Sequence, residues 1–299
     1  MLRNTSTLAV ALFVSLGLLA CSGGSPSGTQ PLNPADSGKP LVDAGDGAVA
    51  TKDSSAAETS NGVDAGTEAA TEAGAPAPEA GTDASSGIHL SGTPKIMTFG
   101  DSITAATCWR ARFWEDLEKN GYKNFQMVGS QDSSGDCSDP NYDGHNEGHS
   151  GYLVVNLANE EPNGEMDGWF SANPPDVVLM HIGTNDVWNK LPTTTILDAY
   201  GVAIDTLRKY APKVVILLAQ IIPMDPSGCS VCAAGVQALD AAIPAWAASK
   251  STTASPIIVV DQWTGFNDAN DTYDGVHPND STGSQKIADK WYSVLAPML

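Results

Sequence analysis

The chain has 299 residues, a formal net charge of −20 at pH 7 and a hydrophobic content of 41%. That length and apolar content are enough for one domain with a substantial buried core. The acidic balance, without any cluster of basic residues, argues against nucleic acid or an anionic lipid surface as the partner.

The first twenty residues have the layout of a secretory signal. A single basic residue precedes an apolar run over residues 8–20, which is too short for a membrane-spanning helix. The run ends in LLAC (18–21), which resembles a bacterial lipobox, in which the cysteine becomes the lipidated first residue of the mature protein. We therefore predict a signal peptide over 1–20 and a lipid anchor on Cys21, with export to the outer membrane or cell surface.

Residues 21–88 differ sharply in composition from the rest of the chain. They are almost all Ala, Gly, Ser, Thr, Pro, Asp and Glu, and they contain no aromatic residue. Such a segment cannot bury enough apolar surface to offset its ordering entropy, so we predict a disordered linker. A flexible tether of this length spans about 40–50 Å on average. The folded domain is then expected over 89–299.

From residue 89 on, apolar runs rich in β-forming residues alternate with helical patterns. We predict strands over 96–99, 125–128, 176–182, 214–222 and 257–260, and helices over 110–120, 196–210, 234–249 and 283–295. Pro244 is expected to kink or divide the third helix. Continuous apolar strands separated by helices predict a parallel sheet covered on both faces. In such folds ligands bind outside the carboxyl ends of the strands.

Polar segments stand close to these strand ends. GDS (100–102) follows the first strand, GTND (183–186) follows the third, EGHSGY (147–152) lies between them, and DGVHP (274–278) precedes the last helix. Ser102 could simply cap a helix. A hydroxyl beside the N–H groups of a helix start is also placed to act as a nucleophile. The choice between these two roles of Ser102 depends on the other three segments.

These four segments, in this order, resemble those of the SGNH (GDSL) hydrolases, with Ile103 where the name-giving motif has leucine. The resemblance implies an α/β fold, namely a three-layer α/β/α sandwich with a central parallel sheet of the flavodoxin-like kind. The order Ser, Asp, His also matches the α/β-hydrolases. The domain has no G-x-S-x-G elbow, however, which argues against that fold.

The resemblance assigns roles to five residues. Ser102 is the expected nucleophile, His277 the base, and Asp274 the group that fixes the tautomer of His277 and stabilises its imidazolium. The backbone N–H groups of Ser102 and Gly151 and the side chain of Asn185 are the expected oxyanion donors. Ester hydrolysis at neutral pH needs each part: an activated hydroxyl, a base, and donors for the developing negative charge.

Longer stretches resemble the acetylxylan esterases of the third carbohydrate esterase family, most specifically VGSQ (128–131) and NEGHSGY (146–152). This implies a serine esterase that removes O-acetyl groups from plant cell-wall polysaccharide through an acetyl-serine intermediate, without metal or organic cofactor. We expect a monomer whose partners are acetylated poly- or oligosaccharides and, through the lipid anchor alone, a membrane. The alternatives are a lipase or thioesterase of the same scaffold that acts on longer acyl esters, and a non-catalytic carbohydrate-binding lipoprotein.

Three residues near these segments are candidate substrate contacts. Trp109 and Arg110 follow Ser102 closely, and Trp188 is an aromatic residue after GTND that could meet the face of a sugar. Packing in the core or at the rim is the competing interpretation for all three. Asp186 is expected to form hydrogen bonds within its own turn.

The four cysteines after Cys21 are Cys108, Cys137, Cys229 and Cys232. An even number in an exported chain indicates two disulfides. Four cysteines allow three pairings, of which we favour Cys108–Cys137 with Cys229–Cys232, because each joins sequence neighbours. A zinc site is the alternative, but export and the wide spacing of the first pair argue against it.

Two segments resemble metal sites only in part. HNEGH (145–149) has its glutamate in the wrong place for a zinc protease, and its glycine argues against the required helix. DPNYDG (139–144) begins like a calcium loop, but Ser150 stands where such a loop has a bidentate glutamate. We therefore predict no metal at the site and leave a structural calcium ion open.

Overall fold

The structure is a computed structural model that describes residues 87–299 except 135–136 and 138–140. The predicted signal peptide, the lipid anchor on Cys21 and nearly all of the predicted linker lie outside the described residues. Within the described part, no helix is both long and apolar enough to cross a membrane.

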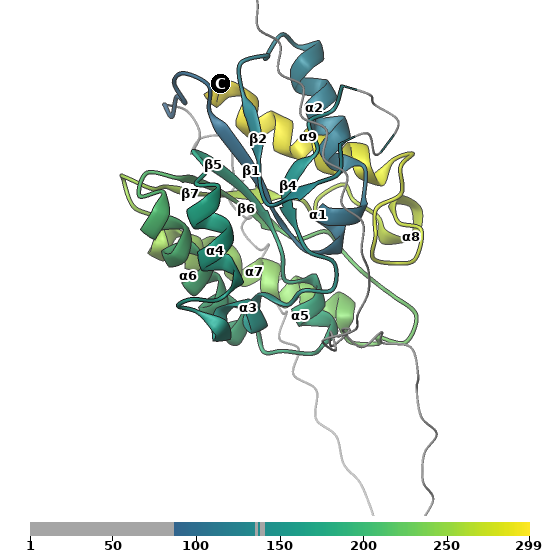
Figure 1. Ribbon diagram of the computed structural model, residues 1–299. Coiled ribbons are helices and arrows are strands. Elements are labelled where there is room, and N and C mark those ends of the chain that lie inside the picture. Colours follow the sequence, from purple (N-terminus) through teal and green to yellow (C-terminus); the bar gives the residue numbers. More distant parts are fainter. Residues whose placement is uncertain (1–86, 135–136, 138–140) are drawn as a thin grey trace, which may run out of the picture. The chain divides into compact units, whose positions relative to one another are not determined.

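A seven-stranded sheet forms the centre of the domain (Figure 1). Its strands are β1 (Lys95–Gly100), β2 (Gln126–Val128), β3 (Gln131–Asp132), β4 (His145–Gly148), β5 (Val177–His181), β6 (Val215–Gln220) and β7 (Ile257–Asp261). One side of β1 pairs with β2 and then β4, while its other side pairs with β5, followed by β6 and β7. All of these pairs are parallel, and only the short β3 runs antiparallel to β4.

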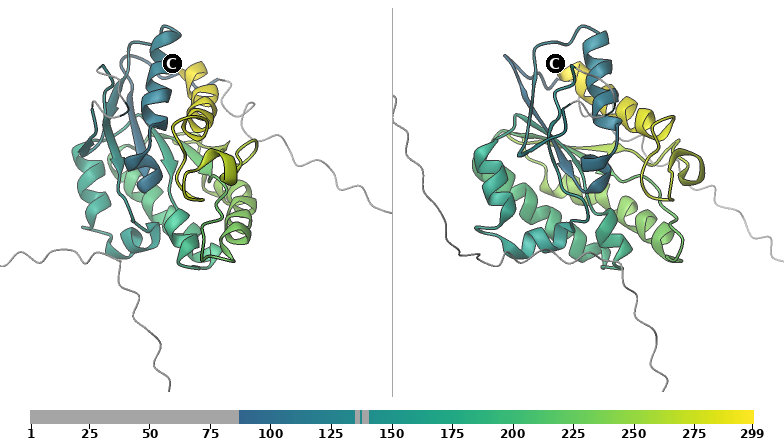
Figure 2. Two further views of the ribbon diagram at one scale, coloured as in Figure 1. Left: turned by 90° about the vertical axis from the view of Figure 1, so that its right-hand side faces the viewer. Right: turned by 45° about the vertical axis from the view of Figure 1, so that its right-hand side comes forward.

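Helices cover both faces of the sheet, as two directions of view show (Figure 1, Figure 2). On one face α2 (Trp109–Lys119) packs against α9 (Gly283–Leu295), and a short 3₁₀ helix, Ala296–Met298, follows α9. On the other face lie α3 (Val154–Glu160), α4 (Glu165–Ala172), α6 (Thr193–Tyr210) and α7 (Cys232–Lys250). The prediction of a three-layer α/β/α sandwich around a central parallel sheet is therefore confirmed.

The layer of α2 and α9 shows why these sequences form helices at these places. Apolar residues recur every four positions in both, so each helix has one buried stripe. The stripe of α2 contains Trp109 and Phe113, and the stripe of α9 contains Trp291. The rings of Trp109 and Trp291 are fully buried and lie 6.2 Å apart. Truncating either ring to alanine would cost about 3–5 kcal/mol of stability.

Several short elements were not predicted from the sequence. They are α5 (Thr184–Trp188), α8 (Asp268–Asp271), β3, β4, α3 and α4, whereas α1 (Ser102–Ala106) is the helix start expected at Ser102. The β4 sequence HNEG has no apolar alternation, and it is a strand because it pairs with the end of β1, where Phe99 faces Glu147. Tertiary pairing thus overrides weak local preference. Pro244 is expected from the sequence to kink or divide α7, but the division does not occur, since the helix continues through this residue.

Both disulfides join the cysteines that are neighbours in sequence. Cys108, the residue just before α2, is bonded to Cys137, and Cys229 is bonded to Cys232 at the start of α7. This is the pairing favoured from the sequence, and it leaves none of these four thiols for a zinc ion. The first bond fixes the segment after α1 to the segment that leads to β4.

Candidate active site

Ser102 lies just after the carboxyl end of β1 and is the first residue of α1. Gly100 ends the strand where the carbonyl of His181 and the side chain of Thr104 leave no room for a Cβ atom. Asp101 is the N-cap of α1, because its Oδ1 accepts a 3.0 Å hydrogen bond from the amide of Ile103. The capping role that the sequence left open for Ser102 therefore belongs to Asp101, and the hydroxyl of Ser102 faces elsewhere.

That hydroxyl belongs to a chain of three side chains. The Oγ of Ser102 lies 2.8 Å from Nε2 of His277, and Nδ1 of His277 lies 2.7 Å from Oδ2 of Asp274. The other oxygen of Asp274 accepts hydrogen bonds from the amides of Val276 and His277. Since Nδ1 faces a carboxylate, Nδ1 carries the proton and Nε2 is left to accept from Ser102.

The surroundings of Asp274 keep its carboxyl charged. Partial burial by itself would raise the pKa of Asp274, but hydrogen bonds from the amide and imidazole of His277 and the amide of Val276 outweigh it. The net result is a pKa below the ordinary value. A carboxylate at this place stabilises an imidazolium on His277, which is what a general base needs when it takes a proton.

The predicted oxyanion residues lie on two neighbouring elements. Gly151 follows β4 with a φ of +82°, and a Cβ there would point into open space, so backbone conformation is what demands glycine. Asn185 lies in α5 after β5, and its Nδ2 donates to the carbonyl of Tyr152 at 3.0 Å. The amide of His149 donates to the carbonyl of Gly100 at 2.9 Å, which holds this loop against the strand end that precedes Ser102.

The amide of Asn185 retains capacity for a further ligand. A side-chain NH₂ group has two donors, and the hydrogen bond to Tyr152 uses one of them. The second donor has no hydrogen-bond partner among the residues that the structure describes. The structure thus brings together Ser102, Asp274 and His277 by direct contact, and joins Asn185 to the loop that contains Gly151.

Asp186 makes hydrogen bonds well beyond those expected from the sequence. Its carboxylate is fully buried and accepts from the amides of Val154 and Val155, each at 3.0 Å, at the start of α3. Hydrogen bonding within its own turn, the expectation from the sequence, is thus only part of its role. A buried carboxylate needs donors, and α3 supplies them because its own N-cap residue, Leu153, has no capping side chain. The partners of Asp186 are backbone amides, which every residue except proline has. The residue types in the sequence therefore do not reveal these hydrogen bonds.

Glu147 and His149 form further hydrogen bonds and ring contacts just ahead of Gly151. Glu147 is fully buried and accepts from the amide and hydroxyl of Ser130, at 2.8 and 2.6 Å, and lies 2.6 Å from Nε2 of His149. The imidazole of His149 stacks on the ring of Trp169 at 3.9 Å. The partners of Glu147 are thus hydrogen-bond donors, and a metal-binding role for HNEGH finds no support.

For two of the three candidate substrate contacts the structure supports packing in the core, the competing interpretation from the sequence. Trp109 is fully buried, and its indole N–H donates to the carbonyl of Ile103. Arg110 is 2% exposed, and its guanidinium donates to carbonyls at the end of α1, where a cation is favourable. Both side chains thus donate hydrogen bonds to backbone carbonyls of α1. Trp188, which is 39% exposed at the end of α5, stays a prediction.

Potential metal ligands do not gather at the candidate site. In the part of the chain that the structure describes, no group of three or more His, Cys, Asp or Glu side chains could hold a metal ion. The calcium-like segment 139–144 lies partly outside the described residues, so that possibility is untested.

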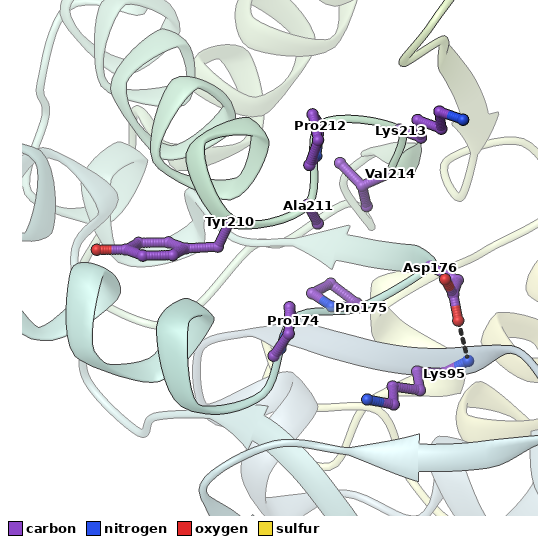
Figure 3. A pocket seen from close by; sticks show the side chains of 9 residues that line it. All are labelled: Lys95, Pro174, Pro175, Asp176, Tyr210, Ala211, Pro212, Lys213 and Val214. Atoms are coloured by element: carbon purple, nitrogen blue, oxygen red, sulfur yellow. Dashed lines mark hydrogen bonds between the residues drawn. The ribbon is translucent and has the colours of Figure 1, made fainter.

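A surface pocket of about 370 Å³ lies away from these residues (Figure 3). It is formed by Lys95 at the start of β1, Pro174 to Asp176 ahead of β5, and residues 210–214 ahead of β6. These are the amino-terminal ends of the strands, whereas Ser102, Gly151 and Asn185 follow the carboxyl ends. The pocket therefore does not belong to the candidate active site.

Comparison with known proteins places this geometry in a family. Residues 98–282 match the GDSL-like lipase/acylhydrolase family, and the chain belongs to that family. It is therefore a carboxylic ester hydrolase.

Three solved structures are similar to this chain over about two thirds of its length. A carbohydrate esterase family 3 protein from Talaromyces cellulolyticus is 33% identical, with a TM-score of 0.62 over 69% of this chain and 98% of that one. A family 3 carbohydrate esterase from Clostridium thermocellum is 27% identical, with a TM-score of 0.56 over 69% and 96%. A serine-to-alanine variant of an acetyl esterase, solved with an acetate ion, is 33% identical, with a TM-score of 0.62 over 69% of this chain and 98% of that one.

A curated relative matches a shorter stretch. The multidomain esterase of Ruminococcus flavefaciens is 33% identical over 115 residues, which is 33% of this chain. The match spans only 15% of the length of that relative.

Proposed function

We propose that the protein is a serine esterase that removes O-acetyl groups from plant cell-wall polysaccharide through an acetyl-serine intermediate. The observation that carries the proposal is the chain of hydrogen bonds from Ser102 through His277 to Asp274, with Asn185 and Gly151 on the adjoining loop and helix. Similarity to carbohydrate esterase family 3 proteins and to an acetyl esterase supports the choice of acyl and alcohol groups.

In the first half-reaction the Oγ of Ser102 attacks the carbonyl carbon of the ester, and its proton moves to Nε2 of His277. The carboxylate of Asp274 stabilises the resulting imidazolium. Negative charge develops on the carbonyl oxygen, which takes hydrogen bonds from the N–H groups of Ser102 and Gly151 and from Nδ2 of Asn185. The intermediate then collapses as the imidazolium donates its proton to the sugar oxygen and the carbon–oxygen bond breaks.

In the second half-reaction water replaces the sugar. His277 takes a proton from the water as its oxygen attacks the acetyl-serine carbonyl, and the same donors hold the second oxyanion. Collapse returns the proton to the Oγ of Ser102 and releases acetate. Every proton stays within reach of Nε2 of His277, so the side chains of this site are sufficient for hydrolysis.

The decisive experiment measures acetate release from acetylated xylan, acetylated rhamnogalacturonan, chitin fragments and a lipid ester. We expect release from at least one acetylated polysaccharide, and Ser102→Ala should lower it by about 10³-fold or more, since the nucleophile is lost. Ser249→Ala removes an exposed hydroxyl at the end of α7 and serves as the matched control. Full activity in Ser102→Ala would overturn the catalytic assignment.

The lipase alternative predicts a different chain-length profile. Comparing nitrophenyl acetate with nitrophenyl octanoate measures it directly, and we expect the acetate ester to be the better substrate. Faster hydrolysis of octanoate would favour a lipid or thioester substrate instead. The signal peptide over 1–20, the lipid anchor on Cys21 and the linker remain part of the proposal, in which the tether lets the domain reach polymer near the membrane.

A further inference from the structure

Tyr273 is an exposed aromatic residue fixed beside the candidate base. The segment from Thr272 to Pro278 folds back on itself, since these two residues form an antiparallel bridge and the amide of Tyr273 donates to the carbonyl of His277 at 3.1 Å. This places the phenol ring parallel to the imidazole of His277, with ring centroids 5.6 Å apart and an angle of 12°. The ring of Tyr273 is therefore held next to the imidazole and nearly parallel to it.

The remainder of this ring is unusually open to solvent. Tyr273 is 66% exposed, and its hydroxyl forms no hydrogen bond with the residues that the structure describes. The large apolar area of an aromatic ring is normally packed, with the hydroxyl paired, because both gain from it. An aromatic residue held open at the edge of a site is a candidate ligand contact.

The reaction itself places the leaving group next to this ring. When the tetrahedral intermediate collapses, the alcohol oxygen must lie within hydrogen-bonding distance of Nε2 of His277. A methyl or ethyl group attached to that oxygen ends there. A pyranose attached to it extends several ångströms further, far enough to reach the ring of Tyr273, whose centroid lies 5.6 Å from that of the imidazole. The C–H face of a pyranose is apolar enough to pack on an aromatic ring.

Charge around the ring favours a neutral sugar. Burial on the inner face, together with the nearby carboxyls of Asp274 and Asp280, raises the pKa of the Tyr273 phenol above its ordinary value. Those same carboxyls would repel a uronic acid at this place. A xylose unit carries no charge and meets no such repulsion.

From this geometry we infer that Tyr273 forms the subsite for the leaving-group sugar and stacks against a neutral pyranose that carries the acetyl group. The inference rests on the proposed function, because it concerns the alcohol side of the same ester. Tyr273 would determine specificity for sugar esters over small esters, and the proton transfers would remain with His277.

The test compares two acetate esters that differ in leaving-group size: acetylated xylo-oligosaccharide and ethyl acetate. We expect Tyr273→Ala to lower kcat/KM about tenfold for the oligosaccharide, through the lost stacking. Ethyl acetate should stay within about twofold of wild type, because its leaving group does not reach the ring. Tyr273→Phe keeps the ring and should behave as wild type on both substrates.

Tyr122→Ala is the matched control. Tyr122 precedes β2 at the amino-terminal edge of the sheet and packs edge-on against Tyr292, so its loss should leave both substrates unchanged. Equal losses on both substrates in Tyr273→Ala would mean that the ring acts on His277 and not on the sugar, and would overturn the inference. So would no loss on either. A wild-type protein that hydrolyses ethyl acetate and no sugar ester would instead refute the proposed function.

Discussion

At the scale of single residues, the strand end at Gly100 divides two roles between neighbours. Asp101 and Ser102 are both good helix caps, so the sequence does not say which one caps α1. In the structure Asp101 takes the cap and is fully buried, which raises its pKa to about 6. Ser102 is left for His277. The direction of each side chain decides this, since that of Asp101 meets the amide of Ile103 and that of Ser102 meets His277.

The role of Asp274 can be isolated by a change of one atom. In Asp274→Asn the side-chain oxygen can still accept from the amides of Val276 and His277, but the new NH₂ group would face Nδ1 of His277. The imidazole would then carry its proton on Nε2 and could no longer accept from Ser102. We expect kcat to fall about 10³- to 10⁴-fold, as for other triads that lose their orienting carboxylate.

The melting temperature of Asp274→Asn should stay close to that of wild type, because the side chain is 40% exposed and keeps its backbone bonds. The control is Asp143→Asn, since Asp143 lies 2.7 Å from Nδ1 of His145 in an exposed pair outside the site. A variant at Asp274 with more than a tenth of wild-type kcat would argue against the tautomer-fixing role.

At the scale of elements, the site depends on how α5 is attached to α3. The carboxylate of Asp186 on α5 caps α3, and the amide of Asn185 binds the loop just ahead of α3. Two adjacent residues thus fix the loop that contains Gly151 relative to α5. None of α3, α4, α5 and β4 was predicted, because each is short and depends on partners distant in sequence.

Asp186→Ala should therefore weaken both stability and catalysis. Loss of two buried hydrogen bonds to amides is expected to lower the free energy of unfolding by about 1–3 kcal/mol. Because Asn185 and Gly151 would lose their fixed relative position, kcat for acetate esters should fall by more than KM rises. Asp186→Asn retains one acceptor oxygen and should recover part of both losses.

The control for this variant is Asp176→Ala. The carboxylate of Asp176 also accepts from a backbone amide, that of Lys95, but at the amino-terminal edge of the sheet (Figure 3). We expect it to lose some stability with kcat unchanged. If Asp186→Ala likewise lost stability alone, Asp186 would be a purely structural cap.

At the scale of the whole molecule, the sequence predicts the layers of the fold better than it predicts which side chains near Ser102 are buried. Long apolar strands, amphipathic helices and neighbouring cysteines carry local signals, and the sheet, its covering helices and both disulfides follow them. The contacts of Trp109 and Arg110 carry no such signal, because nearness to Ser102 in sequence does not tell which face of α2 is buried. Packing against α9 and the end of α1 decides it.

Buried carboxyls make the stability of this acidic molecule depend on pH in an identifiable way. Asp240 on α7 is 5% exposed, its Oδ1 accepts from the amide of Ile221, and its Oδ2 has no partner among the described residues. Burial raises its pKa from 3.8 to about 8. Between about pH 4 and pH 8 the folded protein thus holds a proton that the unfolded chain has lost, and stability falls as pH rises.

Asp240→Asn should remove this dependence while its side-chain oxygen keeps the bond to Ile221. We expect the variant to gain little over wild type near pH 4 and progressively more up to pH 8, where the difference levels off. The slope can reach about 1.4 kcal/mol per pH unit for one proton. Melting temperatures measured from pH 4 to pH 9 test this, with Asp198→Asn, an exposed change on α6, as the control. Parallel curves for Asp240→Asn and wild type would show that Asp240 is ionised in the folded protein throughout this range.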